Sequence, residues 1–78
     1  MALKAYILIK IEPGKDRIIC NKLNEIEEVK AIARTYGLYD ALITVEVESH
    51  GELDEFIFNK LRTIPGVKET MTLISANL

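Results

Sequence analysis

Residues 3–11 form a largely apolar run that is rich in β-branched and aromatic residues and ends at a Glu-Pro-Gly turn, a pattern that predicts a β-strand. One face of this strand is apolar throughout and carries Leu3, Ala5, Ile7, Ile9 and Ile11. The other face is charged at its ends, at Lys4 and Lys10, and apolar in its middle, at Tyr6 and Leu8. A sheet face of this mixed kind is often covered, and a partner chain is one candidate cover.

Apolar and polar residues alternate over much of residues 29–36 and 41–48, which predicts two further strands, and we expect a last strand at residues 67–76. Residues 37–40, Gly-Leu-Tyr-Asp, form a turn between the second and third of these four strands. Because this connection is short, we expect those two strands to form an antiparallel hairpin.

Two other segments repeat their apolar residues at spacings of three and four, which predicts amphipathic helices. The first spans residues 14–25 and repeats them at Ile19, Leu23 and Ile26. The second repeats them at Leu53, Phe56, Ile57 and Leu61. We expect it to be capped by Ser49 or His50 and to stop before Pro65, because proline disfavours helical geometry in the residue before it.

An internal repeat relates the two halves of the chain. Aligning residues 16–30 with residues 54–68 gives eight identities in fifteen positions, and each copy covers the end of a helix, a turn and the start of a strand. Two such halves joined by a hairpin predict a ferredoxin-like βαββαβ sandwich of the α+β class, with two helices on one face of a four-stranded antiparallel sheet. The other face stays bare unless a partner covers it.

Composition narrows the functional classes. The 78 residues suffice for one small domain, and a 49% apolar content is high for that size, which favours self-association. The net charge of −2 argues against direct nucleic-acid binding, since phosphate neutralisation needs a basic surface. Neither a secretory leader nor an apolar run long enough to span a membrane is evident, so we expect a cytoplasmic protein with no membrane partner.

Catalytic chemistry is sparsely represented. His50 is the only histidine and Cys20 the only cysteine, and their predicted positions, a strand–helix junction and the middle of a helix, do not make them a pair. No cluster has the spacing of metal ligands, and no glycine-rich loop is present to cradle a phosphate. We therefore expect no catalytic residues, no metal and no cofactor.

The turn at residues 37–40 offers a different chemistry. Gly37 lets a ligand approach the backbone, Tyr39 supplies a flat apolar wall, and Asp40 supplies a carboxylate for an ammonium group. Thr70 and Thr72 add hydroxyls on one face of the last strand. A free amino acid needs such a set of groups. The alternative is an ordinary hairpin turn with a stabilising aspartate and two unremarkable strand threonines.

Taken in order, three segments resemble the effector domain, or RAM domain, of the leucine-responsive/asparagine-type (Lrp/AsnC) transcription regulators. They are the strand from Ala5 to Gly14, the Gly-Leu-Tyr-Asp hairpin at residues 37–40, and the segment at residues 61–67 with the two threonines that follow it. The resemblance covers essentially the whole chain. Full-length members also carry an N-terminal helix-turn-helix domain, and residues 1–78 resemble a single effector-binding domain without one.

The resemblance implies an oligomeric amino-acid-binding module that regulates without holding DNA itself. Family members form dimers through their sheets, and dimers assemble into rings of four or five, that is octamers or decamers. Effectors, usually amino acids, bind between dimers. By motif, the implied ligand-contacting residues are Gly37, Tyr39, Asp40, Thr70 and Thr72. Full-length regulators of the family are implied as further partners.

Two other functions remain open at this stage. A dimeric α/β barrel also serves small cofactor-free oxygenases and isomerases, in which His50 or Tyr39 would act as the acid or base. A purely structural assembly module would share the fold and the oligomer and lack the ligand. Turnover or ligand binding would separate these functions from a regulatory module.

Overall fold

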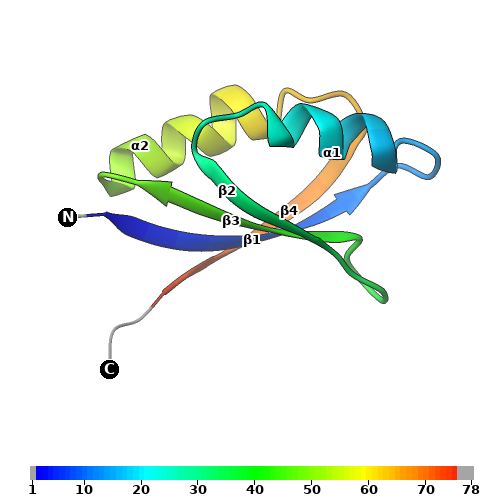
Figure 1. The fold of residues 1–78 in the computed structure, drawn as a ribbon, viewed down its shortest axis with the longest axis horizontal. Helices are drawn as coiled ribbons and strands as arrows, with labels where there is room; N and C mark the ends of the chain where they lie inside the picture. Colours follow the sequence, from blue (N-terminus) through cyan, green and yellow to red (C-terminus); the bar gives the residue numbers. More distant parts are fainter. Residues whose placement is uncertain (1, 76–78) are drawn as a thin grey trace.

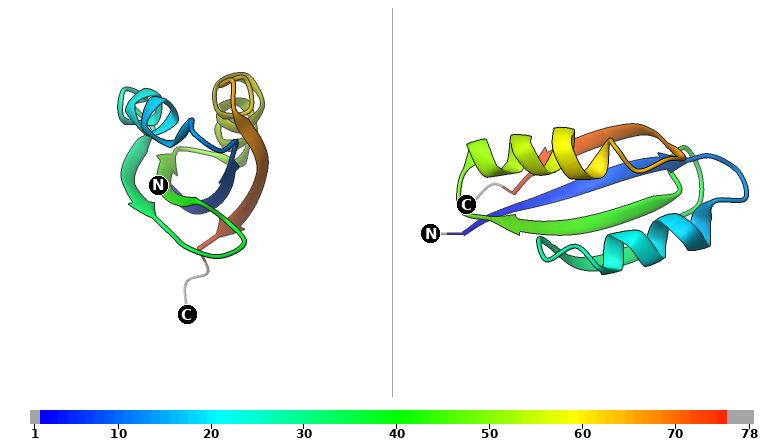
Figure 2. Two further views of the ribbon diagram at one scale, coloured as in Figure 1. Left: turned by 90° about the vertical axis from the view of Figure 1, so that its right-hand side faces the viewer. Right: turned by 90° about the horizontal axis from the view of Figure 1, so that it is seen from above.

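The computed structural model describes residues 2–75 and confirms the βαββαβ order (Figure 1). Its strands are β1 (Leu3–Ile11), β2 (Val29–Arg34), β3 (Ala41–Val47) and β4 (Val67–Ile74). All neighbours pair antiparallel, in the order β2-β3-β1-β4. The helical segments are α1 (Asp16–Asn24) and α2 (His50–Glu55), the latter continued by a π-helical segment, η1 (Phe56–Leu61). Both lie on one face of the sheet, as predicted (Figure 2).

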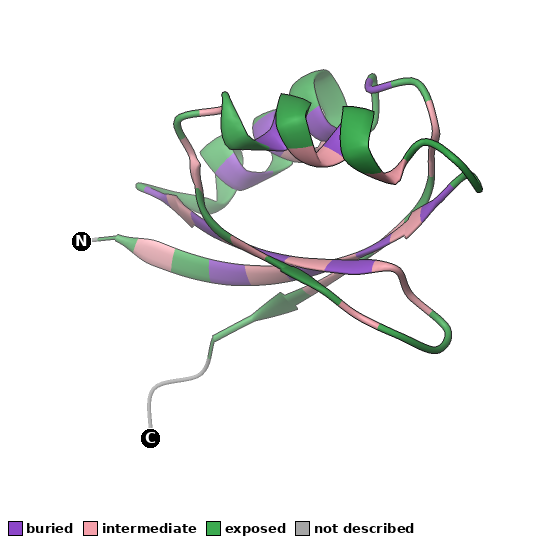
Figure 3. Ribbon diagram, turned by 45° about the vertical axis from the view of Figure 1, so that its right-hand side comes forward, coloured by how far each residue is buried: buried purple, intermediate pink, exposed green. Residues whose placement is uncertain are grey.

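The core lies between the sheet and the helical layer. The apolar face predicted for β1 supplies much of it, because Ala5, Ile7 and Ile9 are fully buried. From the helical layer, Ile19, Leu23, Phe56 and Leu61 complete the same cluster. Figure 3 shows buried positions on the inner sides of the helices and along the central strands. The period-two pattern in β1 thus places one side of the sheet in the core and directs the other side away from it.

The first helix is shorter than the sequence pattern predicts. It begins at Asp16 rather than at residue 14, because Gly14 has a φ of +88°, which lies outside the right-handed helical region. Two hydrogen bonds, Lys15 N–H to the Glu12 carbonyl and Ile19 N–H to the Lys15 carbonyl, lead the chain from the turn into the helix. The turn therefore takes up residues 12–15.

The second helix starts with a side-chain cap. Ser49 Oγ accepts a hydrogen bond from Glu52 N–H at 3.2 Å, and the Glu52 carboxylate accepts one from Glu48 N–H at 2.6 Å. This arrangement satisfies backbone N–H groups at the helix start, as a capping box does. Of the two residues expected to cap this helix, Ser49 is the cap and His50 is the exposed first helical residue.

A π-helical turn in the second helix was not predicted. Phe56 and Leu61 are both buried, although residues five apart lie on different sides of an α-helix. The wider π turn, in which Arg62 N–H donates to the Ile57 carbonyl, brings them onto one side. The internal repeat breaks here for the same reason: Phe56 is buried, whereas its counterpart Ile18 is 58% exposed.

Strand β2 also departs from simple alternation. The register shifts between Val29 and Ala31, so Lys30 occupies a bulge and the faces exchange after it. Val29 and Ile32 consequently both pack against the core, whereas Ala31 is exposed. The strand ends at residue 34 rather than 36, and β3 ends at residue 47 rather than 48. The predicted end of the last strand at residue 76 lies outside the described residues.

Gly66 occupies the tightest backbone position next to the core. Its carbonyl accepts a hydrogen bond from Glu12 N–H at 2.8 Å, which joins the start of β4 to the end of β1. Its φ is +100°, and a Cβ added there would lie 2.9 Å from Cδ1 of Ile19 and 3.3 Å from Cβ of Lys15. Both the backbone conformation and the space thus favour glycine.

We expect Gly66→Ala to lower the free energy of unfolding by about 1–3 kcal/mol, since a non-glycine residue at positive φ is strained and this one also presses on a core isoleucine. The matched control is Gly37→Ala, which has a φ of +106° but open space around the added Cβ. Urea denaturation of both variants separates the two effects. An equal loss in the two variants would show that the contact with Ile19 contributes nothing.

Candidate functional site

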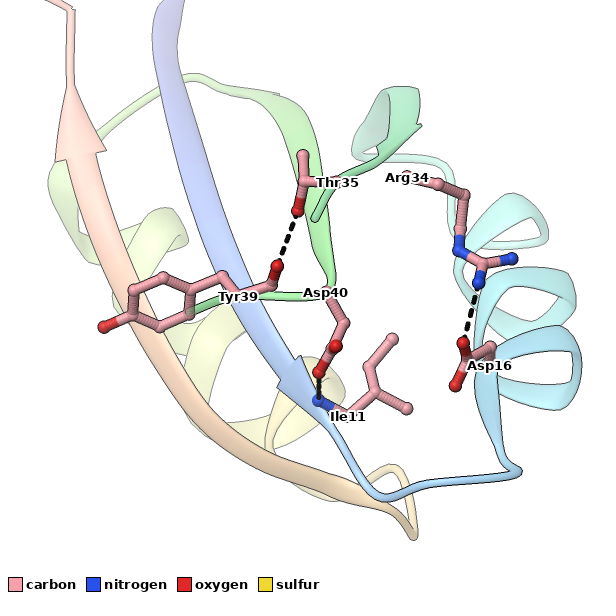
Figure 4. Close-up of polar contacts among 6 residues, drawn as sticks. All are labelled: Ile11, Asp16, Arg34, Thr35, Tyr39 and Asp40. Atoms are coloured by element: carbon pink, nitrogen blue, oxygen red, sulfur yellow. Dashed lines mark hydrogen bonds and ion pairs between the residues drawn. The ribbon is translucent and has the colours of Figure 1, made fainter. Parts of the chain in front are cut away.

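The hairpin between β2 and β3 is held closed by its own polar groups. Thr35 N–H donates to the Asp40 carbonyl at 3.0 Å, and the Thr35 hydroxyl donates to the Tyr39 carbonyl at 2.8 Å (Figure 4). Gly37, with a φ of +106°, turns the chain at the tip. Tyr36 and Leu38 on either side of it are exposed. The tip therefore exposes two apolar side chains to solvent or to a binding partner.

Asp40 fastens this hairpin to the end of β1. Its backbone N–H donates to the Ile9 carbonyl at 2.9 Å, and its Oδ2 accepts a hydrogen bond from Ile11 N–H at 2.7 Å (Figure 4). The second bond lies where β1 shifts register against β4, between Lys10 and Ile11. A carboxylate that accepts from a backbone N–H is a strong acceptor, so this contact fixes the hairpin relative to the sheet.

Tyr39 extends from the hairpin toward β4. Its hydroxyl oxygen lies 4.0 Å from the Met71 sulfur, and Figure 4 shows its ring over that strand. Met71 pairs opposite Leu8, so it belongs to the sheet face that carries no helices. Tyr39 therefore borders that face at its hairpin end.

Thr70 and Thr72 face the opposite way. They pair with Ile9 and Ile7, whose side chains are buried under the helical layer, so both threonines share the helix-bearing face. The structure brings Gly37, Tyr39 and Asp40 together in one hairpin but does not bring the threonines to the same side within one chain. None of the three surface cavities described below is lined by any of these five residues.

The helix-free face of the sheet, which we call the open face, is apolar in its middle. Strand pairing places these large side chains on it: Tyr6, Leu8, Leu42, Met71 and Leu73. Met71 and Leu73 are 47% and 50% exposed. Charged pairs flank the apolar centre. Lys4 pairs with Glu46 across the two strands, and Lys10 Nζ lies 4.0 Å from Oε2 of Glu69. An apolar centre with charged ends was predicted for this face of β1, and the neighbouring strands β3 and β4 continue it.

Two cavities, of about 380 and 170 Å³, lie near the start of β2 and are rich in glutamate. Glu28 and Glu52 line both cavities. The Lys60 ammonium lies 2.7 Å from the Glu28 carboxylate, and this hydrogen bond lowers the pKa of Glu28 and raises the pKa of Lys60. The ion pair ties η1 to the start of β2, and we regard it as structural.

The third cavity, of about 330 Å³, is a groove between α1 and β2. It has a different chemistry, since Arg17 and Arg34 are among its lining residues. Arg34 reaches across from β2 and its Nη2 lies 2.7 Å from Oδ2 of Asp16 on α1 (Figure 4).

Nothing in residues 2–75 assembles a metal site, because no group of three or more histidine, cysteine, aspartate or glutamate side chains is suitably placed. Cys20 is partly buried in the groove beside α1, and His50 is exposed at the start of α2. No helix in the described part of the chain is long and apolar enough to cross a membrane.

A family model described as the Lrp/AsnC ligand binding domain matches residues 4–77. The chain belongs to this family. Its members are regulatory ligand-binding domains rather than enzymes, so the hypothesis of a small oxygenase or isomerase is wrong. The resemblance found in the hairpin and closing motifs is thereby confirmed.

Individual relatives agree with this assignment. An uncharacterized HTH-type transcriptional regulator of Pyrococcus furiosus is 40% identical over 70 residues, which cover 90% of this chain and 47% of the relative. The crystal structure of FFRP-DM1 superposes with a TM-score of 0.91 at 36% identity, covering 95% of this chain and 99% of that one. AsnC from E. coli superposes with a TM-score of 0.90 at 30% identity, covering 97% and 52%. The chain spans about half the length of the curated relatives it matches.

Sequence reasoning missed the hydrogen bond between Asp40 and Ile11, which joins residues 29 apart. A signal was available in part, because a carboxylate directly after a tight turn commonly accepts backbone N–H bonds. The hydrophobic pattern of residues 3–11 did not predict the register shift between Lys10 and Ile11, which is where Ile11 N–H meets this carboxylate.

We expect Asp40→Ala to leave Ile11 N–H without its acceptor, which lowers the free energy of unfolding by about 1–3 kcal/mol. Asp40→Asn keeps an acceptor oxygen without the charge and should lose less. Amide hydrogen exchange measured by NMR should show faster exchange at Ile11 in the alanine variant than in the wild type. Unchanged exchange at Ile11 would mean that the bond does not hold the hairpin to β1.

Proposed function

We propose that this domain is an amino-acid-binding regulatory module that works as an oligomer. The observation that carries the proposal is the Gly37–Asp40 hairpin in a chain that matches a ligand-binding family over residues 4–77. The proposed ligand is a free amino acid. Its ammonium group would bind Asp40, its carboxylate would bind backbone N–H groups near Gly37, and the Tyr39 ring would form one wall for its side chain.

The geometry at Asp40 supports this role. A carboxylate accepts hydrogen bonds at both oxygens, and only Oδ2 is used by Ile11 N–H. Oδ1 accepts no hydrogen bond from residues 2–75. The structural contact thus holds the group in place while leaving an acceptor for an ammonium group.

A second copy is part of the proposal because none of the three cavities described for residues 2–75 is lined by Gly37, Tyr39 or Asp40. The open face carries Tyr6, Leu8, Leu42, Met71 and Leu73, and a contiguous apolar face of this kind marks an interaction surface. We propose that copies dimerise through this face and that dimers assemble into octameric or decameric rings. Neighbouring subunits would then bring Thr70 and Thr72 near a hairpin from another chain.

The regulatory role is proposed through the relatives, one of which is described as an HTH-type transcriptional regulator. We propose that residues 1–78 constitute one effector-binding domain, which senses its ligand and associates with such regulators in the cytoplasm. Direct contact with DNA is not part of the proposal, because the net charge is −2.

Isothermal titration calorimetry against the twenty amino acids tests ligand binding. At least one should bind, and Asp40→Ala should weaken that binding by about 1.5–3 kcal/mol, the value of a hydrogen bond to a charged group. Asp54→Ala removes an exposed carboxylate elsewhere and serves as the control. If no amino acid binds, the domain is a structural assembly module; equal affinities in wild type and Asp40→Ala would remove Asp40 from the site.

Sedimentation velocity tests the interface. Leu73→Lys places a charge on the open face and should shift the oligomer toward smaller species, since an unpaired buried charge is costly. Ile18→Lys is the matched control on α1, because Ile18 and Leu73 are 58% and 50% exposed. A wild-type protein that sediments as a monomer, or a larger effect from Ile18→Lys, would contradict an interface on the open face.

A further inference from the structure

The groove between α1 and β2 has a lining suited to an anion. Its volume is about 330 Å³, and none of its lining residues belongs to the turn at residues 35–40. It lies on the helix-bearing side of the sheet, because Ile32 and Arg34 pair with buried residues of β3. The lining residues are Arg17, Cys20, Asn21, Asn24, Ile32 and Arg34. The lining thus combines two arginines and two asparagines with an isoleucine and a cysteine.

The four residues from α1 form one stripe along the helix. Arg17, Cys20, Asn21 and Asn24 follow spacings of three, one and three, which place them on a single side. The core stripe of the same helix is the neighbouring one, with Ile19 and Leu23. Helix α1 therefore packs against the core with Ile19 and Leu23, and its polar stripe lines the groove next to the edge strand β2.

The two arginines differ in their hydrogen bonds and ion pairs. Asp16 accepts a hydrogen bond from Nη2 of Arg34 at 2.7 Å, which orients that guanidinium while leaving its other N–H groups available. Arg17 forms no hydrogen bond or ion pair with any of residues 2–75. Both guanidinium groups line the same groove, and a guanidinium matches the geometry of a carboxylate or phosphate group.

The equivalent helix positions in the second half of the fold carry different side chains. By the internal repeat, the counterparts of the α1 stripe are Glu55, Phe58, Asn59 and Arg62. There, the Arg62 guanidinium lies 5.3 Å from the centre of the Phe58 ring and covers it. In the second half, the position of Arg17 is thus taken by an acid, Glu55, and the arginine that is present, Arg62, stacks on an aromatic ring. The groove is a property of its side chains rather than of the fold.

We propose that this groove is a second ligand site, separate from the hairpin, for a small molecule bearing a carboxylate or phosphate group. Arg17 and Arg34 would hold the anionic group, and Asn21 and Asn24 would bind polar groups beside it. Ile32 and the side chain of Cys20 would contact an apolar portion. The site is complete within one chain, so it does not depend on the proposed function of the hairpin or on the oligomer.

NMR titration of the ¹⁵N-labelled full chain tests the proposal, with inorganic phosphate and succinate as separate probes and sodium chloride at matched ionic strength as the control. Either probe should shift the side-chain amide signals of Asn21 and Asn24 in a saturable manner and leave those of Asn59 in place. The probe that binds more tightly identifies the anionic group. Arg17→Ala should weaken binding about tenfold, the effect of losing one charge-assisted contact. Lys22→Ala, an exposed cation of α1 outside the groove lining, should change it less than twofold.

Three results would overturn the proposal: no saturable shift with either probe, the same shifts with sodium chloride, or equal losses in the two variants. Since Arg17 is exposed, its replacement should leave the remaining amide spectrum unchanged, and that spectrum verifies folding. Signals from residues 37–40 report separately on the hairpin, so failure at the groove is distinguishable from failure of the proposed amino-acid site.

Discussion

One constraint governs this molecule: a four-stranded sheet has two faces, and residues 2–75 place helices on only one of them. The alternation along β1 expresses it directly, because Ile7 and Ile9 are fully buried whereas Leu8, between them, lies on the open face. Burial of the inner residues supplies the hydrophobic stabilisation of the monomer. The same alternation leaves an apolar surface on the other side, which is the basis of the proposed oligomer.

The hairpin depends on the same sheet through Asp40. This carboxylate accepts from Ile11 N–H where β1 shifts against β4, so the conformation of the hairpin and the end of the central strand are coupled. The end of β1 is in turn joined to the start of β4, where Gly66 packs against Ile19. A ligand that engages Asp40 would therefore act on a contact connected to the helical layer. If the proposed ligand binds there, this chain of contacts would connect it to the surfaces of the domain.

The sequence patterns were sufficient for the element order, the core face of β1 and the antiparallel hairpin, because each follows from local periodicity. They were insufficient where a contact joins distant residues. The bulge at Lys30, the π turn that brings Phe56 and Leu61 together, and the Asp40 bond to Ile11 all depend on packing partners far along the chain. At the candidate site, the motif placed Tyr39 and Asp40 together. In the last strand, the sequence placed the two threonines on one face and Met71 on the other. It did not show which of these two faces carries the helices.

The central claim is that a second copy covers the open face. Isotope-filtered NMR on a mixture of ¹³C-labelled and unlabelled chains tests it most directly, because it detects only contacts between copies. If the proposed dimer forms, we expect intermolecular cross-peaks from the side chains of Leu8, Leu42 and Met71, and none from Ile18 on α1. Intermolecular contacts confined to the helical side, or none at concentrations where the protein is fully associated by sedimentation, would contradict the claim.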